Sequence, residues 1–204
     1  MKSLIIEIID PKRIGELVTV GRIFGGAPDI LALGKGEIPG AYANAYRADE
    51  AVAANIVDAA AQLIGQQGYD VILLSATTVG AEIAGRLSVR LSAPVISEVI
   101  ALSADMTVKR PLYGGKAVAE YKIKKTPVIL TIRRKYFEPA VLEGMTTAAQ
   151  LGAGGAVTFI SEEEIKTEGI PLEDAEVIIS GGRGIGAKEN FGMLREMAGM
   201  VNAA

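Results

Sequence analysis

The 204-residue chain contains no cysteine and no histidine. Without cysteine it has no disulfide framework, no thiolate nucleophile and no cysteine-ligated metal. Without histidine it lacks both the commonest general base and the commonest metal ligand. These absences exclude Ser-His-Asp catalysis, Cys-His catalysis and most zinc sites, and they favour a binding role over nucleophilic catalysis.

The chain also lacks an excess of positive charge and any long apolar run. Its formal net charge is -3, from 21 basic and 24 acidic residues, which argues against nucleic-acid binding. No apolar stretch approaches the ~20 residues of a membrane span. The first residues enter a strand-like run without a signal-peptide pattern, so we expect a cytoplasmic protein.

What is present is an alternation of strand and helix patterns. Strands are predicted at residues 4–9, 29–33 and 71–74, and the last of them is a continuous apolar run. Helices are predicted after Asp10-Pro11, after a cap at Asp49, and over residues 78–91. This order predicts an α/β fold of three layers, with a mostly parallel sheet covered by helices on both faces.

Residues 95–132 change to a period of two, which is typical of half-buried strands. The stretch Tyr113-Gly114-Gly115-Lys116 is a hairpin turn signal. Residues 128–132 read as an inner strand of the main sheet. We therefore predict antiparallel additions to the parallel sheet.

The sequence pattern changes again in the C-terminal part, from about residue 138 onward. Residues 144–155 resemble a linker, and strands are predicted at 156–161 and 175–180, the latter followed by a glycine-rich loop and a helix over about 188–200. A lone βα unit cannot bury both faces of its strand. Self-association into a homo-oligomer is therefore one hypothesis for this segment.

The glycine-rich loop is the first candidate site. Gly182, Gly184 and Ala187 fit a G-x-G-x-x-A spacing between a strand and a helix, where backbone N–H groups and the helix dipole meet an anion. Arg183 adds a forked donor for phosphate or an electron-rich ring. The alternative is a plain structural connection.

The second candidate is the turn Ser75-Ala76-Thr77-Thr78-Val79-Gly80, at the carboxyl end of a parallel strand. Open α/β sheets bind ligands at such ends, so Thr77, Thr78 and Gly80 form a possible nucleotide or anion turn. The favoured alternative is that Thr77 or Thr78 only caps the following helix.

Several ordered stretches together resemble the α subunit of electron transfer flavoproteins. The strongest match is Val-Ile-Ile-Ser-Gly-Gly-Arg-Gly at residues 177–184, with Glu-Asn-Phe at 189–191 behind it. The other matching stretches are residues 69–80, 83–87, 90–91, 96–99, 110–117 and 131–133.

The resemblance implies a Rossmann-like N-terminal domain, similar to adenine nucleotide α-hydrolases, over residues 1–137. It further implies a linker or extension over 138–172 and an incomplete FAD-binding domain from 173 to 204. In that family the domain pairs with a β subunit, and Arg183 takes the place of an arginine that contacts FAD, on a loop shaped by Gly181, Gly182 and Gly184. AMP is a second possible ligand.

The function implied is electron carriage between flavin dehydrogenases and an acceptor, by a subunit that is not itself a catalyst. The family's other flavin-contacting motifs are absent from these 204 residues. We therefore expect either a truncated chain or an α-related protein. The alternative function is a non-redox nucleotide- or partner-binding module that retains only the N-terminal fold.

Overall fold

The computed structural model describes residues 1–152, 154–155, 157–158, 160–161, 170, 172 and 175–204. Two compact units make up the chain, Met1–Phe159 and Ile160–Ala204, and each is described by itself. Parts of the strand expected at 156–161 and of the connector up to 172 lie outside the described residues. The domain boundaries expected at 137/138 and 172/173 stay a prediction.

The first unit is built on a seven-stranded sheet in the order β12-β4-β2-β1-β5-β10-β6. Every neighbouring pair in it is parallel. The inner strand expected at 128–132 is confirmed, between β5 and β6. The strands are β1 (Ser3–Ile8), β2 (Asp29–Leu33), β4 (Ala45–Ala48), β5 (Val71–Ser75), β6 (Val95–Val99), β10 (Val128–Ile132) and β12 (Ala149–Gln150).

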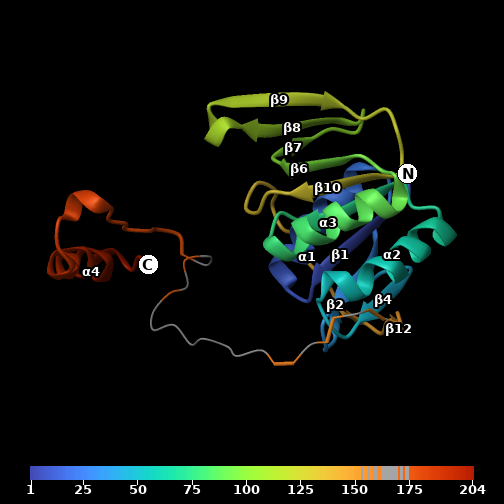
Figure 1. The fold of residues 1–204 in the computed structure, drawn as a ribbon, viewed down its shortest axis with the longest axis horizontal. Helices are drawn as coiled ribbons and strands as arrows, with labels where there is room; N and C mark the ends of the chain where they lie inside the picture. The colour runs from blue at the N-terminus through green and yellow to red at the C-terminus, as the bar shows by residue number, and fades with distance from the viewer. Residues whose placement is uncertain (153, 156, 159, 162–169, 171, 173–174) are drawn as a thin grey trace. The chain divides into compact units, whose positions relative to one another are not determined.

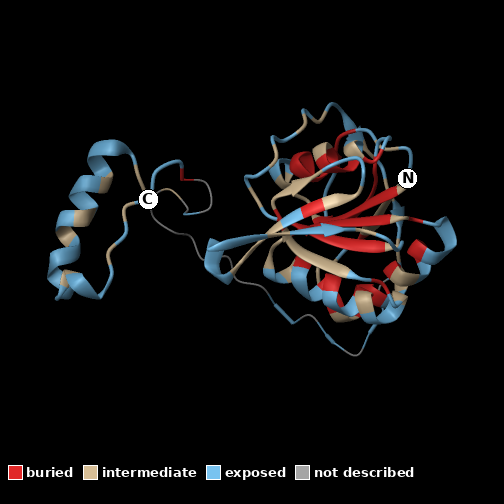
Figure 2. Ribbon diagram, turned by 90° about the horizontal axis from the view of Figure 1, so that it is seen from above, coloured by how far each residue is buried: buried red, intermediate tan, exposed pale blue. Residues whose placement is uncertain are grey.

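Helices cover both faces of this sheet, as the alternation predicts (Figure 1). Helix α1 (Pro11–Ile23) packs on one face, and its Ile14 and Leu17 are fully buried. Helices α2 (Ala53–Gln67) and α3 (Thr78–Leu91) pack on the other. The central strands carry the buried residues of both cores (Figure 2). The three-layer α/β fold is therefore confirmed.

The helix starts follow local capping, with one correction. Asp10 caps α1, and its Oδ1 accepts from the backbone N of Lys12 at 2.9 Å. The expected cap at Asp49 is wrong, because α2 begins at Ala53 after Val52. Asp49 instead pairs with Arg47 of β4 at 3.1 Å, so the carboxylate is engaged by the strand that precedes it.

The antiparallel part forms its own three-stranded sheet, called here the arm, from β7 (Ala101–Leu102), β8 (Thr107–Leu112) and β9 (Ala117–Lys122). The hairpin turn is confirmed as a short 3-10 turn, η1 (Tyr113–Gly115). Antiparallel strands added to the main sheet were expected, but the arm is a separate sheet that does not pair with it. Glu98, within β6, takes a left-handed conformation (φ 58°) where the pairing of β6 with β10 shifts register, and Val99 still pairs with Ile132 before the arm begins.

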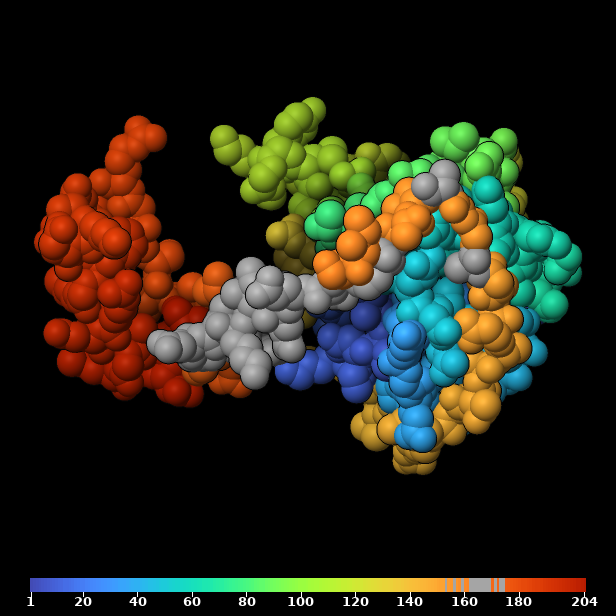
Figure 3. Space-filling view, turned by 60° about the horizontal axis from the view of Figure 1, so that its bottom comes forward, coloured from blue at the N-terminus to red at the C-terminus, as the bar shows by residue number. Residues whose placement is uncertain are grey.

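After β10 the chain runs back along α1 and across to the opposite edge of the sheet. Glu16 of α1 accepts the backbone N–H of Lys135 at 3.1 Å, and the Gly15 carbonyl accepts that of Ala140 at 3.0 Å. Strand β11 (Met145–Thr146) then pairs with β3 (Ile38–Pro39), and β12 pairs with β4. Figure 3 shows this crossing segment in orange over the blue and cyan part of the unit. Part of the expected linker is thus edge strand.

The second unit contains α4 (Phe191–Val201), which confirms the helix expected there. The strand expected at 175–180 is wrong, because these residues carry no strand. Their backbone instead bonds the end of the chain: the N–H of Ile179 donates to the Ala204 carbonyl at 2.9 Å. The described residues offer this stretch no neighbouring strand with which to form a ladder.

In the part of the chain that the structure describes, we find no helix with the length and apolar character needed to cross a bilayer.

Candidate functional site

The carboxyl ends of β1 and β5 form the point where the sheet reverses its direction of growth. Strand β1 is followed by α1 and its neighbour β2, while β5 is followed by α3 on the opposite face and leads toward β6. Parallel α/β sheets place ligand sites in the crevice beyond such a switch point. The second candidate turn, at the end of β5, lies here.

Within that turn the residues are engaged with one another. Thr77 Oγ1 accepts the backbone N–H of Gly80 at 3.1 Å, so Thr77 caps α3. A Cβ on Gly80 would overlap the carbonyl oxygen of Ser75, and only glycine fits there without a backbone shift. Thr78 is exposed in the first turn of α3. The turn therefore forms the N-cap of α3, and its use as a nucleotide site stays a prediction.

A buried carboxylate lies beside the turn, and our sequence reasoning missed it. Glu7 of β1 is only 3% exposed. Its Oε2 accepts the backbone N–H of Ser75 at 3.0 Å, and its Oε1 accepts that of Ile8 at 3.1 Å. The Arg13 guanidinium lies 3.9 Å from Oε1. The available signal was a single acidic residue inside the apolar run at 4–9.

Burial raises the pKa of the Glu7 carboxyl above its ordinary value. The hydrogen bonds from Ser75 and the charge of Arg13 act in the opposite direction and reduce that rise. Because both carboxylate oxygens already accept backbone N–H groups, Glu7 joins the ends of two strands. Among the described residues no group of three carboxylates could hold a metal ion.

The glycine-rich loop lies in the second unit and brings its four predicted residues onto one turn. Arg183 begins the 3-10 turn η2 (Arg183–Ile185) and is exposed. A Cβ on Gly181 would overlap the side chains of Leu194 and Ile185, so this glycine allows the loop to pack on α4. Gly182 and Gly184 have open space where a Cβ would stand. The loop backbone is therefore accessible at these two positions.

The second unit also exposes much apolar surface. None of the residues of α4 is buried. Met193 is 58% exposed and Met200 is 82% exposed, and the preceding Ile178 is 52% exposed. These three side chains are therefore only partly packed against other described residues of this unit.

Comparisons with known proteins agree on one family. Residues 40–162 match the electron transfer flavoprotein domain. The chain is 32% identical over 150 residues to an electron transfer flavoprotein subunit alpha of Pseudomonas aeruginosa, covering 71% of this chain and 48% of that protein. It is 32% identical over 149 residues to that of Paracoccus denitrificans, covering 71% and 48%. It is also 30% identical over 164 residues to protein FixB of Escherichia coli, covering 76% and 52%. The chain thus spans about half the length of the curated relatives it matches.

Proposed function

The chain belongs to the electron transfer flavoprotein family, and we propose that it acts there as an α-type subunit, carrying electrons from flavin dehydrogenases to an acceptor through FAD held with a β subunit. The observation that carries the proposal is the family match over residues 40–162 together with the similarity to electron transfer flavoprotein alpha subunits. In this role the chain is an electron carrier in the cytoplasm and catalyses no reaction of its own.

The glycine-rich loop of the second unit is suited to binding a phosphate group or an aromatic ring of FAD. Gly182 and Gly184 leave their backbone open to close approach, and Arg183 extends an exposed guanidinium beside them. A guanidinium donates paired hydrogen bonds to phosphate and stacks on aromatic rings. When bound, FAD supplies the reversible electron-accepting ring system, while this loop would bind and orient it.

The partner in this proposal is a β subunit. Apolar side chains on α4 and on the stretch before it are solvent-exposed in the second unit. Contiguous exposed apolar surface marks interaction sites. A homo-oligomer through the same residues is the alternative, and sedimentation of the chain alone at high concentration distinguishes the two.

The deciding experiment is a visible absorption spectrum of the chain, alone and mixed with FAD and a β subunit, recorded after desalting. We expect flavin bands that persist in the three-component sample. If the spectra stay flat above the protein region in both samples, the proposal is wrong. The non-redox module would then be favoured, and it predicts a colourless protein that binds AMP at the turn formed by Thr77, Thr78 and Gly80.

A further inference from the structure

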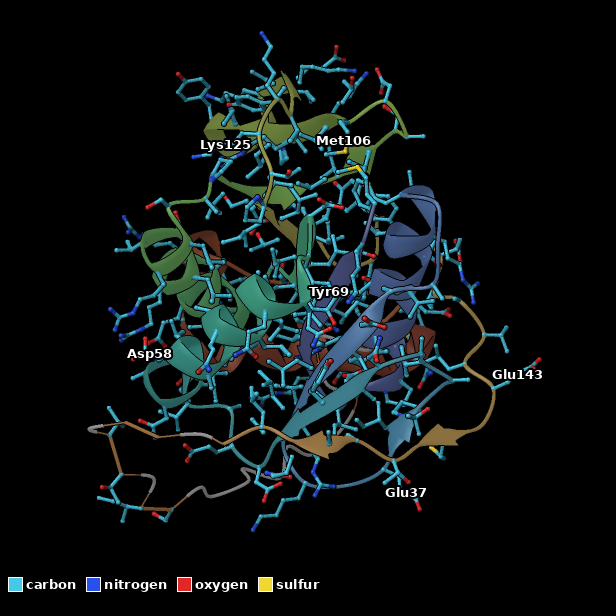
Figure 4. The ribbon with its side chains drawn as sticks, turned by 90° about the vertical axis from the view of Figure 1, so that its right-hand side faces the viewer. Glu37, Asp58, Tyr69, Met106, Lys125 and Glu143 are labelled. Carbon is cyan, nitrogen blue, oxygen red and sulfur yellow. The ribbon has the colours of Figure 1, made fainter. Side chains whose placement is uncertain are left out.

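A groove of about 730 Å³ lies between the arm, the end of α3 and the start of β6. Its floor is apolar and includes Val95, Ile96 and Ile123. Its rim is basic and includes Arg110, Lys124 and Lys125. Lys125 is labelled in Figure 4, where the arm meets the helix layer. The whole groove belongs to the first unit.

Of the groove's cationic side chains, Lys122 pairs with Asp105 at 2.7 Å, while Arg110, Lys124 and Lys125 form no ion pair with the described residues. Arg110 Nε is buried without a hydrogen-bond partner in the part of the chain that the structure describes. No aspartate or glutamate among the described residues lines the groove. Lys125 Nζ donates to the Ser92 carbonyl at 3.1 Å, a neutral acceptor that leaves its charge unpaired. A buried guanidinium nitrogen without a partner is costly, so an incoming acceptor is favoured there.

We propose that this groove binds a small organic anion that has an apolar body and a carboxylate head. Small-molecule sites in proteins occupy roughly 300–1,000 Å³ and combine apolar walls with a few placed polar groups. The Arg110 guanidinium matches the geometry of a carboxylate, and the apolar floor matches an aliphatic or aryl body. This site is independent of the flavin proposal, because none of its residues belongs to the glycine-rich loop.

The test is a titration of the whole chain with octanoate, followed by amide chemical shifts in two-dimensional NMR. We expect saturable shifts at Val95, Ile96 and Ile123. Acetate has the carboxylate but lacks the long alkyl chain. Octylamine has the alkyl chain but carries a positive charge. Both are expected to leave these amides unshifted over the same concentrations. Equal binding of acetate or of octylamine overturns the proposal.

Variants locate the head group. Arg110→Gln removes the charge while preserving most of the side-chain length, and we expect it to weaken octanoate binding about tenfold or more. Lys116→Gln is the matched control, since Lys116 is exposed on the same arm and does not line the groove. Lys124→Gln serves as a second variant if Arg110→Gln unfolds the arm, and it is expected to weaken binding in the same direction.

Two further outcomes would count against the site. The proposal fails if the arginine variant and the Lys116 control bind octanoate equally well. It also fails if a glutamate-rich peptide binds more tightly than octanoate at these amides, because the groove would then be a peptide surface.

Discussion

The carboxylate of Glu7 on β1 accepts the backbone N–H of Ser75 at the end of β5, across 3.0 Å. This bond joins two neighbouring strands at the point where α1 and α3 leave the sheet on opposite faces. The carboxyl group is buried, and burial raises its pKa. Its protonation is therefore coupled to the stability of the first unit.

That coupling has a definite sign. A carboxyl with a raised folded pKa holds its proton more tightly in the folded state, so the free energy of unfolding falls as pH rises from about 4.5 through the folded pKa. Glu16, whose pKa is also raised by burial, contributes in the same direction. We expect Glu7→Gln to reduce the fall and leave the part due to Glu16. Urea unfolding between pH 4 and pH 8 measures this, and an unchanged pH dependence in the variant would contradict it.

The second prediction concerns the lack of room for a side chain at Gly80. We expect Gly80→Ala to lower the free energy of unfolding by about 1–3 kcal/mol, because the new Cβ would overlap the Ser75 carbonyl. Gly85→Ala, on the same helix, is the control, since no atom lies near its Cβ position. It is expected to stabilise the helix by up to about 1 kcal/mol. Thermal unfolding of both variants decides the matter, and equal shifts would refute the packing argument.

Replacing Thr77 by alanine is predicted to cost more stability than replacing Thr78. Thr77→Ala removes the cap of α3 and should cost about 1 kcal/mol of stability. Thr78→Ala leaves the cap bond in place and should change stability little. Chemical denaturation of the two variants provides the comparison. A larger loss from Thr78→Ala would show that the cap assignment is wrong.

Asn55 fixes the chain that follows β12. Its Nδ2 donates to the Val157 carbonyl at 2.7 Å and to Glu50 Oε1 at 2.8 Å, and the side chain is buried. We expect Asn55→Ala to destabilise the first unit by about 1–3 kcal/mol, because buried polar groups lose their partners. Gln62→Ala, on the exposed side of α2, should be neutral. Limited proteolysis combined with denaturation tests this, with faster cleavage expected only in the Asn55 variant.

Arg183 is predicted to matter for the cofactor and not for folding. In the complex with a β subunit, we expect Arg183→Ala to weaken FAD retention tenfold or more, at about 1.5–3 kcal/mol for a lost charge-assisted hydrogen bond. Its exposure means that the melting temperature of the chain alone should not change. Arg195→Ala, exposed on α4, is the control. Equal FAD retention by both variants would remove Arg183 from the proposed site.

The central strands of the main sheet were predictable because they are largely apolar, whereas β4 was not predicted and β12 lies within the expected linker. Residues 71–75 and 78–91 fall within a residue of where the periodicity places them. The separation of the arm from the main sheet was not predictable, since a period of two indicates strands but not which sheet they join. At residues 175–180 an apolar run resembled a strand, but a strand also needs a neighbour, which local sequence does not report.

The candidate site was predicted only in part. The turn at 75–80 was recognised because it follows a buried strand, and its cap follows from the threonine. Glu7 was missed because the run around it was interpreted only for its apolar residues. An ionisable residue among fully buried positions requires partners, and this reasoning would have pointed to the backbone of the adjoining strand.

Strand β12 covers part of one edge of the main sheet. It pairs along β4, with Gln150 opposite Arg47, and so occupies the edge that β4 would otherwise leave open. An open edge strand offers unpaired N–H and C=O groups to other copies of a chain. A fragment ending near residue 137 would keep every central strand and both helix layers, yet it would uncover β4 at Tyr46 and Arg47. We therefore expect such a fragment to aggregate more readily than the unit that extends through about residue 151.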